Sequence, residues 1–326
     1  HTGEKRALAA ISLATMIICA VGVFIDISVI TVAPIALAIG KKSGYHKEAL
    51  LLAMIGGGKA GNIISPNPNT IAVSEAFKVD LTSLMMKNFI PAICAVVVTI
   101  LLSTMLSKKQ GVQVTENDLE QKEDKNLPLF IQAVAGPVVV VILLALRPVA
   151  SIVIDPLIAL PVGGVVCALA CGQIKNIREY AEFGLGKVVG VSVLLIGTGT
   201  IAGIIKASAL QYDVVHILKM ANMPAFLLAP IAGILMAGAT ASTTAGATIG
   251  AQTFAGTLIK SGVSALSAGA MVHAGATVID SLPHGSFFHA TSGAAGLEIK
   301  ERMKLIPYEM CVGLTSTVVA VMMYVI

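Results

Sequence analysis

The most distinctive group of hydrogen-bonding side chains lies in the hexapeptide Ser65-Pro66-Asn67-Pro68-Asn69-Thr70. Its two prolines remove backbone donors and clash with the preceding turn, so the hexapeptide cannot continue an α-helix. It nevertheless lies between the apolar stretch Leu50–Ile64 and the short helical stretch Ile71–Phe77. Irregular backbone inside a membrane is tolerated only where protein or a water-filled cavity covers it. The hexapeptide is therefore the first place to expect a solute site.

Asn67, Asn69 and Thr70 are the side chains that we expect to contact a substrate or an ion there. Asn69 or Thr70 can cap a helix that begins near Ile71, because short polar side chains accept hydrogen bonds from the first free N–H groups. A helix N-terminus carries about half a positive charge and binds anions readily. The alternative is a plain loop between helices at the membrane surface.

Ser242, Thr243 and Thr244 form a second polar group, inside the uncharged run Met220–Ile259. As one helix this run would be about 60 Å long, twice the thickness of the hydrocarbon core, so we expect it to break within 238–246. Hydroxyl groups in membrane helices often bond back to a carbonyl one turn earlier, and this is the alternative. At a break, the same groups would face a substrate.

Four ionisable side chains in apolar surroundings are candidates for charge and proton chemistry, because such groups are costly in a membrane. Lys59, among glycines, could neutralise an anionic substrate or pair with a carboxylate. Asp26 lies where we expect the first apolar run to break. Asp280 and His284 lie in one polar segment, and histidine titrates near neutral pH. We expect Asp26, Asp280 or His284 to carry a coupling proton.

The composition indicates a membrane protein. Hydrophobic residues make up 56% of the 326 residues and charged residues only 12%, whereas soluble domains have about 25% charged residues. The five cysteines lie in apolar stretches without metal-type spacing, so we expect no metal site. No cofactor is expected beyond a coupling ion, which would be H⁺ or alternatively Na⁺. Nothing in the net charge of +4 points to nucleic acid.

The apolar runs and their interruptions predict an all-α, polytopic membrane protein with about 9–11 membrane segments and inverted repeats. Residues 1–107 would form a first-repeat portion with a broken segment at 65–70. Residues 108–125 would be a polar linker, and residues 126–326 a second-repeat portion with a broken segment at 238–246. Two broken helices, one in each half, are typical of transporters with a site at the membrane midplane.

Four segments resemble motifs of the gluconate permease (GntP) family of the ion transporter superfamily. They are Phe24-Ile25-Asp26-Ile27, Ile63 through Thr70 with the helix after it, Gly238 through Ala247, and Ala274 through Phe288. Gluconate permeases often read His-Pro-Gly-Pro where this chain has Asn67-Pro68-Asn69-Thr70, and Leu282-Pro283-His284 is an addition to the late motif. The resemblance implies that roughly the first quarter of the family's length is missing before His1.

The resemblance implies a secondary active transporter of a bacterial inner membrane that takes up gluconate or a related hydroxy-carboxylate with a proton. Its partners would be this small organic anion and the lipid bilayer, with a homo-oligomer left open. A Na⁺-coupled carboxylate transporter and a passive channel are alternatives. An intramembrane enzyme, with a metal on Asp280, His284 and His289, is a further alternative, although the sequence has neither H-E-x-x-H nor G-x-S-x-G.

Overall fold

The chain is described by a computed structural model that covers residues 6–119, 128–150, 152, 154–220 and 223–326. These residues contain sixteen α-helices and no β-strand, which confirms the all-α expectation. The backbone divides into two compact units. One consists of His1–Glu120 and Thr198–Ile326, and the other of Gln121–Gly197.

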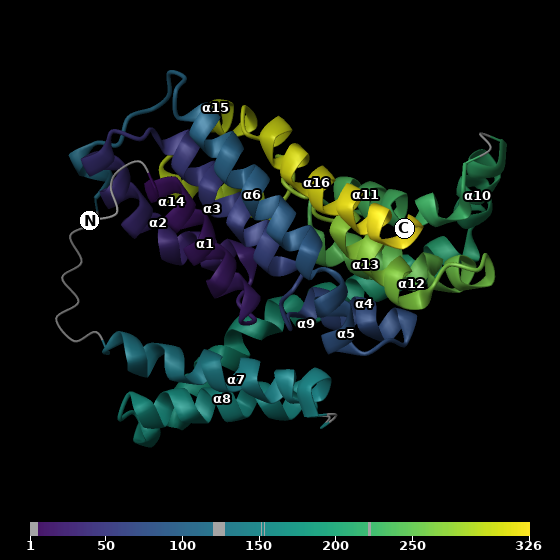
Figure 1. The fold of residues 1–326 in the computed structure, drawn as a ribbon, viewed down its shortest axis with the longest axis horizontal. Helices are drawn as coiled ribbons and strands as arrows, with labels where there is room; N and C mark the ends of the chain where they lie inside the picture. The colour runs from purple at the N-terminus through teal and green to yellow at the C-terminus, as the bar shows by residue number, and fades with distance from the viewer. Residues whose placement is uncertain (1–5, 120–127, 151, 153, 221–222) are drawn as a thin grey trace. The chain divides into compact units, whose positions relative to one another are not determined.

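The larger unit contains two runs of six helices that follow the same order (Figure 1). Each run begins with a helix, a short break, a second helix and a third helix. A polar break, a ten-residue helix, a short helix and a final long helix follow. The first run is α1 (Ala7–Ala20), α2 (Ile25–Ser43), α3 (Lys47–Asn62), α4 (Pro68–Phe77), α5 (Leu81–Lys87) and α6 (Phe89–Leu106). The second is α11 (Leu228–Thr240), α12 (Thr243–Lys260), α13 (Ala265–Gly275), α14 (Ser286–Ala295), α15 (Ile299–Met303) and α16 (Ile306–Val325).

Residues with positive φ occur at matching places in the two runs. The three pairs are Gly22 and Ala241 after the first helix, Gly44 and Gly262 after the second, and Lys78 and Gly296 after the ten-residue helix. Gly44 and Lys78 are 34 residues apart, as are Gly262 and Gly296. The repeat is therefore preserved in the backbone, although the two halves share little sequence.

The two runs contact each other reciprocally. Helix α4 packs against α12 of the other run, and α2 packs against α14. Reciprocal contacts of this kind arise when two similar units are related by a two-fold axis. Helix order thus pairs the break before α4 with the break before α14, and the break before α2 with the break before α12. The polar composition of 65–70 and 238–246 had suggested that these two breaks correspond to each other. The inverted orientation of the two halves stays a prediction.

The helix breaks lie where the sequence indicated, but the capping differs from the expectation. Helix α4 begins at Pro68 rather than near Ile71, because the fixed φ and missing N–H of proline suit the first helical position. Asn67, not Asn69 or Thr70, is the N-cap. The uncharged run 220–259 breaks between α11 and α12, at Ala241 and Ser242.

Helix α3 is buried along its whole length and packs against α1, α2 and α6 (Figure 1). Its glycines allow this close approach, since small residues let membrane helices come together. A Cβ atom at Gly57 would lie 2.1 Å from the carbonyl oxygen of Ser12 on α1.

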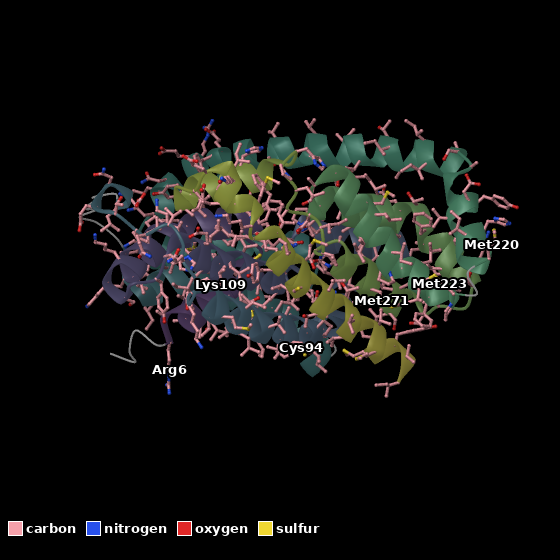
Figure 2. The ribbon with its side chains drawn as sticks, turned by 90° about the horizontal axis from the view of Figure 1, so that it is seen from above. Arg6, Cys94, Lys109, Met220, Met223 and Met271 are labelled. Atoms are coloured by element: carbon pink, nitrogen blue, oxygen red, sulfur yellow. The ribbon has the colours of Figure 1, made fainter. Side chains whose placement is uncertain are left out.

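Figure 2 shows the contrast between the fully buried Met271 of α13 and Arg6, which extends away from α1.

Gly57→Ala is expected to destabilise the protein by about 1–3 kcal/mol, because the added methyl group overlaps backbone that cannot rotate away. Thermal unfolding of the detergent-purified protein measures this. The matched control is Gly256→Ala on α12, where a Cβ would meet nothing within 4 Å. An equal melting temperature for the two variants would contradict the close packing of α1 on α3.

Among the described residues, two stretches meet the length and composition expected of membrane-crossing helices. They are Phe89–Leu106 and Ile299–Val325, the second formed by α15 and α16 together. Both carry large apolar side chains on their exposed surfaces, such as Leu101 and Met322. Several other apolar helices, such as α1 and α8, are shorter. The number of crossings stays a prediction.

The described part of the predicted 108–125 linker, up to Leu119, is bound to the helix ends. Glu48 of α3 accepts a hydrogen bond from the Val112 backbone at 2.9 Å. Lys47 bonds both Asp118, at 2.6 Å, and the carbonyl of Gly296 at the end of α14, at 3.0 Å. This loop therefore joins the first run of helices to the second. Residues 120–125 lie outside the described residues.

The polar contacts of this loop shift two pKa values. Burial alone would lower the pKa of His46, but hydrogen bonds to Glu48 and to the Leu106 carbonyl, and the charge of Glu48, raise it above 6.5. The two ring nitrogens of His46 lie 2.9 Å from a Glu48 carboxylate oxygen and 3.0 Å from the Leu106 carbonyl oxygen. For Asp118, burial alone would raise the pKa, but hydrogen bonds from Lys47 and Thr115 lower it below 3.8.

Asp118→Asn is expected to destabilise the protein by about 1–3 kcal/mol near neutral pH, since a charged hydrogen bond to Lys47 is lost. The folded pKa of Asp118 lies below its unfolded value, so its contribution is present above about pH 4 and is lost as pH falls through the folded pKa. Melting temperatures measured from acid to neutral pH should therefore converge for the two proteins at the acid end. A constant difference would contradict the ion pair.

The smaller unit contains a helical hairpin. Helix α7 (Phe130–Ala150) packs against α8 (Pro156–Ala170), and a Cβ at Gly136 would lie 2.6 Å from the Gly163 carbonyl oxygen. A cavity of about 760 Å³ borders α8 and is lined by residues including Gln132, Cys167 and Tyr180. Four further elements connect the hairpin to α11. They are η3 (Ile174–Asn176), α9 (Ile177–Ala207) and α10 (Leu210–Met220), followed by η4 (Ala225–Leu227).

Candidate functional site

Lys59 and Asp280 form a buried ion pair between the two runs of helices. Their Nζ and Oδ1 atoms are 2.5 Å apart, and their side chains are 2% and 1% exposed. Lys59 lies near the end of α3, and Asp280 lies in the irregular segment between α13 and α14. Burying two charges costs several kcal/mol per ion, so such a pair persists only with close geometry and further hydrogen bonds.

Those further hydrogen bonds come from the start of α12 and from the segment around Asp280 itself. Thr243, the first residue of α12, donates to Asp280 Oδ2 at 2.5 Å, and Ser281 donates to Oδ1 at 3.0 Å. Lys59 also donates to the carbonyl oxygen of Thr277 at 2.6 Å, just beyond the end of α13. The charged cluster of Lys59, Asp280, Thr243 and Ser281 therefore ties three interrupted helices together.

A neutral amide cluster lies one helical turn from Lys59. Asn62 Oδ1 accepts hydrogen bonds from Asn67 Nδ2 at 2.6 Å and from Asn69 Nδ2 at 3.0 Å. All three asparagines are at most 2% exposed. Asn62 Nδ2 and Asn69 Oδ1 have no hydrogen-bond partner among the described residues. A buried polar atom without a partner costs about 1–3 kcal/mol, so this cluster is incomplete as it stands.

The charged and amide clusters occupy corresponding places in the two runs. Gly44 and Gly262, Lys78 and Gly296, and the N-caps Asn67 and Gly285 are each 218 residues apart. The same separation relates Lys59 to Thr277 and Asn62 to Asp280. One half thus carries a carboxylate where the other carries an amide.

The helix N-termini nearest the charged cluster are those of α12 and α14. A Cβ at Gly285, the N-cap of α14, would lie 2.4 Å from the Ala241 carbonyl oxygen, so the starts of the two helices are in contact. No side chain caps α14, and neither helix has an acidic residue in its first turn. The free N–H groups of α14 are therefore available to an anion, whereas Ser242 already accepts one N–H group of α12.

The N-terminus of α4 is less suited to an anion than the sequence suggested. Asn67 Oδ1 accepts the backbone N–H groups of Asn69 and Thr70, at 3.0 and 3.1 Å. The Asn67 carbonyl accepts the N–H of Ile71. The first donors of α4 are thus already used by its own cap, and the Thr70 hydroxyl also bonds Asn67.

The remaining candidates lie outside the two clusters. Asp26 accepts a hydrogen bond from the adjacent Ile27 N–H in the first turn of α2. His284 is exposed in the turn before α14, and His289 is exposed and bonds the Pro283 carbonyl. Asp280 thus has Lys59, rather than His284, as its charged partner. Ser242 caps α12, and Thr244 is half-buried in its first turn.

Two features were missed in the sequence. Asn62 went unnoticed because it is a single amide at the end of an apolar helix, although it lies five and seven residues from its partners. Arg302 and Glu309 form a second buried pair, with side chains 0% and 1% exposed. Their i, i+7 spacing, two helical turns apart, was the available signal.

The two similar halves, the interrupted helices and the buried charged cluster at their breaks define a class of protein, the polytopic membrane transporters. A family model described as GntP family permease matches residues 1–326. A Haemophilus influenzae protein described as an "uncharacterized transporter" is 52% identical over 322 residues, which is 99% of this chain and 77% of that protein. The chain belongs to the GntP family of permeases, as the motifs had indicated, and is a membrane transporter rather than an enzyme.

Proposed function

We propose that this permease is a proton symporter for gluconate or a related hydroxy-carboxylate. The observation that carries the proposal is the buried Lys59–Asp280 pair between the two halves. A cation at the contact of three helix breaks suits an anionic substrate, and a carboxylate beside it suits a proton. Membership of the GntP family supports a small organic acid as the substrate.

Coupling follows from the exchange of partners at Lys59. When Asp280 takes up a proton it loses its charge, and Lys59 is left as an unpaired buried cation. The substrate carboxylate then replaces Asp280 as the partner of Lys59, assisted by the positive ends of α12 and α14. One proton and one monoanion leave the charge of the cluster unchanged, so neither binds well without the other.

The same exchange would release the halves from each other. In the structure Lys59 of the first run binds Asp280 and the Thr277 carbonyl of the second. Protonation of Asp280 weakens that link, and the breaks at 63–67 and 276–285 are the places where the backbone can bend. We propose that this step permits alternating access across a bacterial inner membrane.

Na⁺ coupling is the alternative supported by the chemistry of the cluster. Asp280, the Thr243 hydroxyl and the Thr277 carbonyl offer the oxygen ligands that hard cations prefer. In the structure the Lys59 ammonium group already contacts two of these three oxygens. A proton on Asp280 therefore requires less rearrangement than a Na⁺ ion in the place of Lys59.

Uptake of labelled gluconate and 3-hydroxybutyrate into reconstituted vesicles tests the proposal. An imposed inward proton gradient should drive accumulation above the external concentration, and a Na⁺ gradient should add nothing. Accumulation driven by Na⁺ alone would favour the alternative ion. Equilibration without accumulation would indicate a channel, and no uptake of any hydroxy-carboxylate would refute the proposed substrate class.

A further inference from the structure

We propose that Asn62 and Asn69 form a subsite that binds a hydroxyl group of the transported carboxylate. This inference rests on the proposed function and adds the group by which the substrate is selected. It starts from two buried atoms, Asn62 Nδ2 and Asn69 Oδ1, that lack hydrogen-bond partners among the described residues. One is a donor and the other an acceptor.

The hydrogen-bond network fixes which end of each amide is free. Asn62 Oδ1 receives N–H groups from both Asn67 and Asn69, so turning the Asn62 amide over would place its N–H₂ group against two other N–H₂ groups. Asn69 donates its own N–H₂ to Asn62, so turning it over would set two oxygens against each other. The free atom of Asn62 is therefore the donor, and the free atom of Asn69 is the acceptor.

A hydroxyl group matches this pair because it donates one hydrogen bond and accepts others. The two free atoms belong to amides that one hydrogen bond joins, and in the proposed subsite a substrate hydroxyl accepts from Asn62 Nδ2 and donates to Asn69 Oδ1. A carboxylate only accepts and a methylene group does neither. The pair therefore distinguishes a hydroxylated acid from its deoxy analogue.

The position of Asn62 relative to Lys59 indicates where the hydroxyl lies on the substrate. Residues three apart on a helix share a face, with Cβ atoms about 5–6 Å apart. A carboxylate bound at Lys59 would place a hydroxyl near Asn62 when the two groups are separated by at least one further carbon. The class of ligand is thus a 3-hydroxy acid or a longer polyhydroxy acid.

The test compares dissociation constants of matched acids on the purified protein, by thermal shift or calorimetry. The probes are 3-hydroxybutyrate against butyrate, and gluconate against hexanoate. The wild-type protein should bind each hydroxylated acid about 10- to 100-fold more tightly, because the deoxy analogue leaves both amides unpaired. Asn62→Ala and Asn69→Leu should reduce this ratio to about 1.

Asn88→Ala is the matched control. Asn88 is also fully buried with both amide atoms unpaired among the described residues, but it lies between α5 and α6, outside the amide cluster. This variant should keep the wild-type ratio, which supports a specific effect of the Asn62–Asn69 pair. Equal loss in all three variants would overturn it.

The wild-type comparison needs no variant and separates two kinds of failure. Equal binding of hydroxylated and deoxy acids would overturn the hydroxyl subsite, would indicate that only a water molecule bridges the two amides, and would leave carboxylate transport standing. Binding of neither class would refute the proposed function, and the subsite with it.

Discussion

Asp280→Asn is expected to abolish proton-driven accumulation of substrate and to destabilise the protein. The amide cannot carry the coupling proton, and it leaves the Lys59 charge buried without a counterion. Breaking one side of a buried pair in this way costs about 3–5 kcal/mol. Uptake into vesicles under an imposed proton gradient and thermal unfolding in detergent measure the two effects separately.

The double variant Lys59→Met with Asp280→Leu separates coupling from folding. Replacing a buried pair by apolar residues of similar size is often neutral or stabilising, so most of the lost stability should return. Accumulation should not return, because neither charge is left. Arg178→Ala is the control, since the Arg178–Glu182 pair is exposed and surface pairs contribute about 0–1 kcal/mol. Accumulation by a well-folded double variant would refute the role of the pair.

Arg302→Ala is expected to cause a comparable loss of stability, about 3–5 kcal/mol, without a role in coupling. Arg302 of α15 binds both carboxylate oxygens of Glu309 on α16, with Nη2 and Oε2 3.2 Å apart. Its guanidinium also lies 4.9 Å from the ring centroid of Phe288 on α14. Removing it leaves a buried carboxylate unpaired and disconnects three helices. Thermal unfolding measures the loss.

Transport per folded molecule distinguishes this pair from Lys59–Asp280. The variant Arg302→Met with Glu309→Leu should recover stability and, unlike its counterpart at the helix breaks, should recover proton-driven accumulation as well. The reason is position, since Arg302 and Glu309 join α15 to α16 within one half, whereas Lys59 and Asp280 join the halves. Persistent loss of accumulation in stable protein would show that Arg302 takes part in transport.

Much of the architecture could be predicted because its causes are local. Proline chemistry and the length limit of a span indicated breaks near 65–70 and 238–246, and helix α4 differs in starting at Pro68 with Asn67 as its N-cap. Lys59 and Asp280 could each be identified as candidates because a charged side chain in apolar surroundings is costly in free energy. Motif resemblance indicated the GntP family, which the match over the whole chain confirms.

The partners within the site could not be predicted in the same way. Lys59 and Asp280 are 221 residues apart, and no feature of either segment indicates that the other residue is its partner. Proximity in sequence favoured His284, whose side chain the turn before α14 leaves exposed. The pairing of the breaks was missed because the halves match in positive-φ positions and helix lengths rather than in residue types.

The amide of Asn62 in one half and the carboxylate of Asp280 in the other make the two halves electrically different. Two halves with identical groups at 62 and 280 would be interchangeable, and binding at either would be electrically equivalent. In the proposed mechanism only the second half changes charge when a proton binds, at Asp280, while the first half contributes the fixed cation Lys59 and a neutral amide cluster. Under the proposed mechanism, one half of the duplicated scaffold therefore has a fixed charge and the other a variable one, and Asn62→Asp is the substitution that would give both halves a carboxylate at this place.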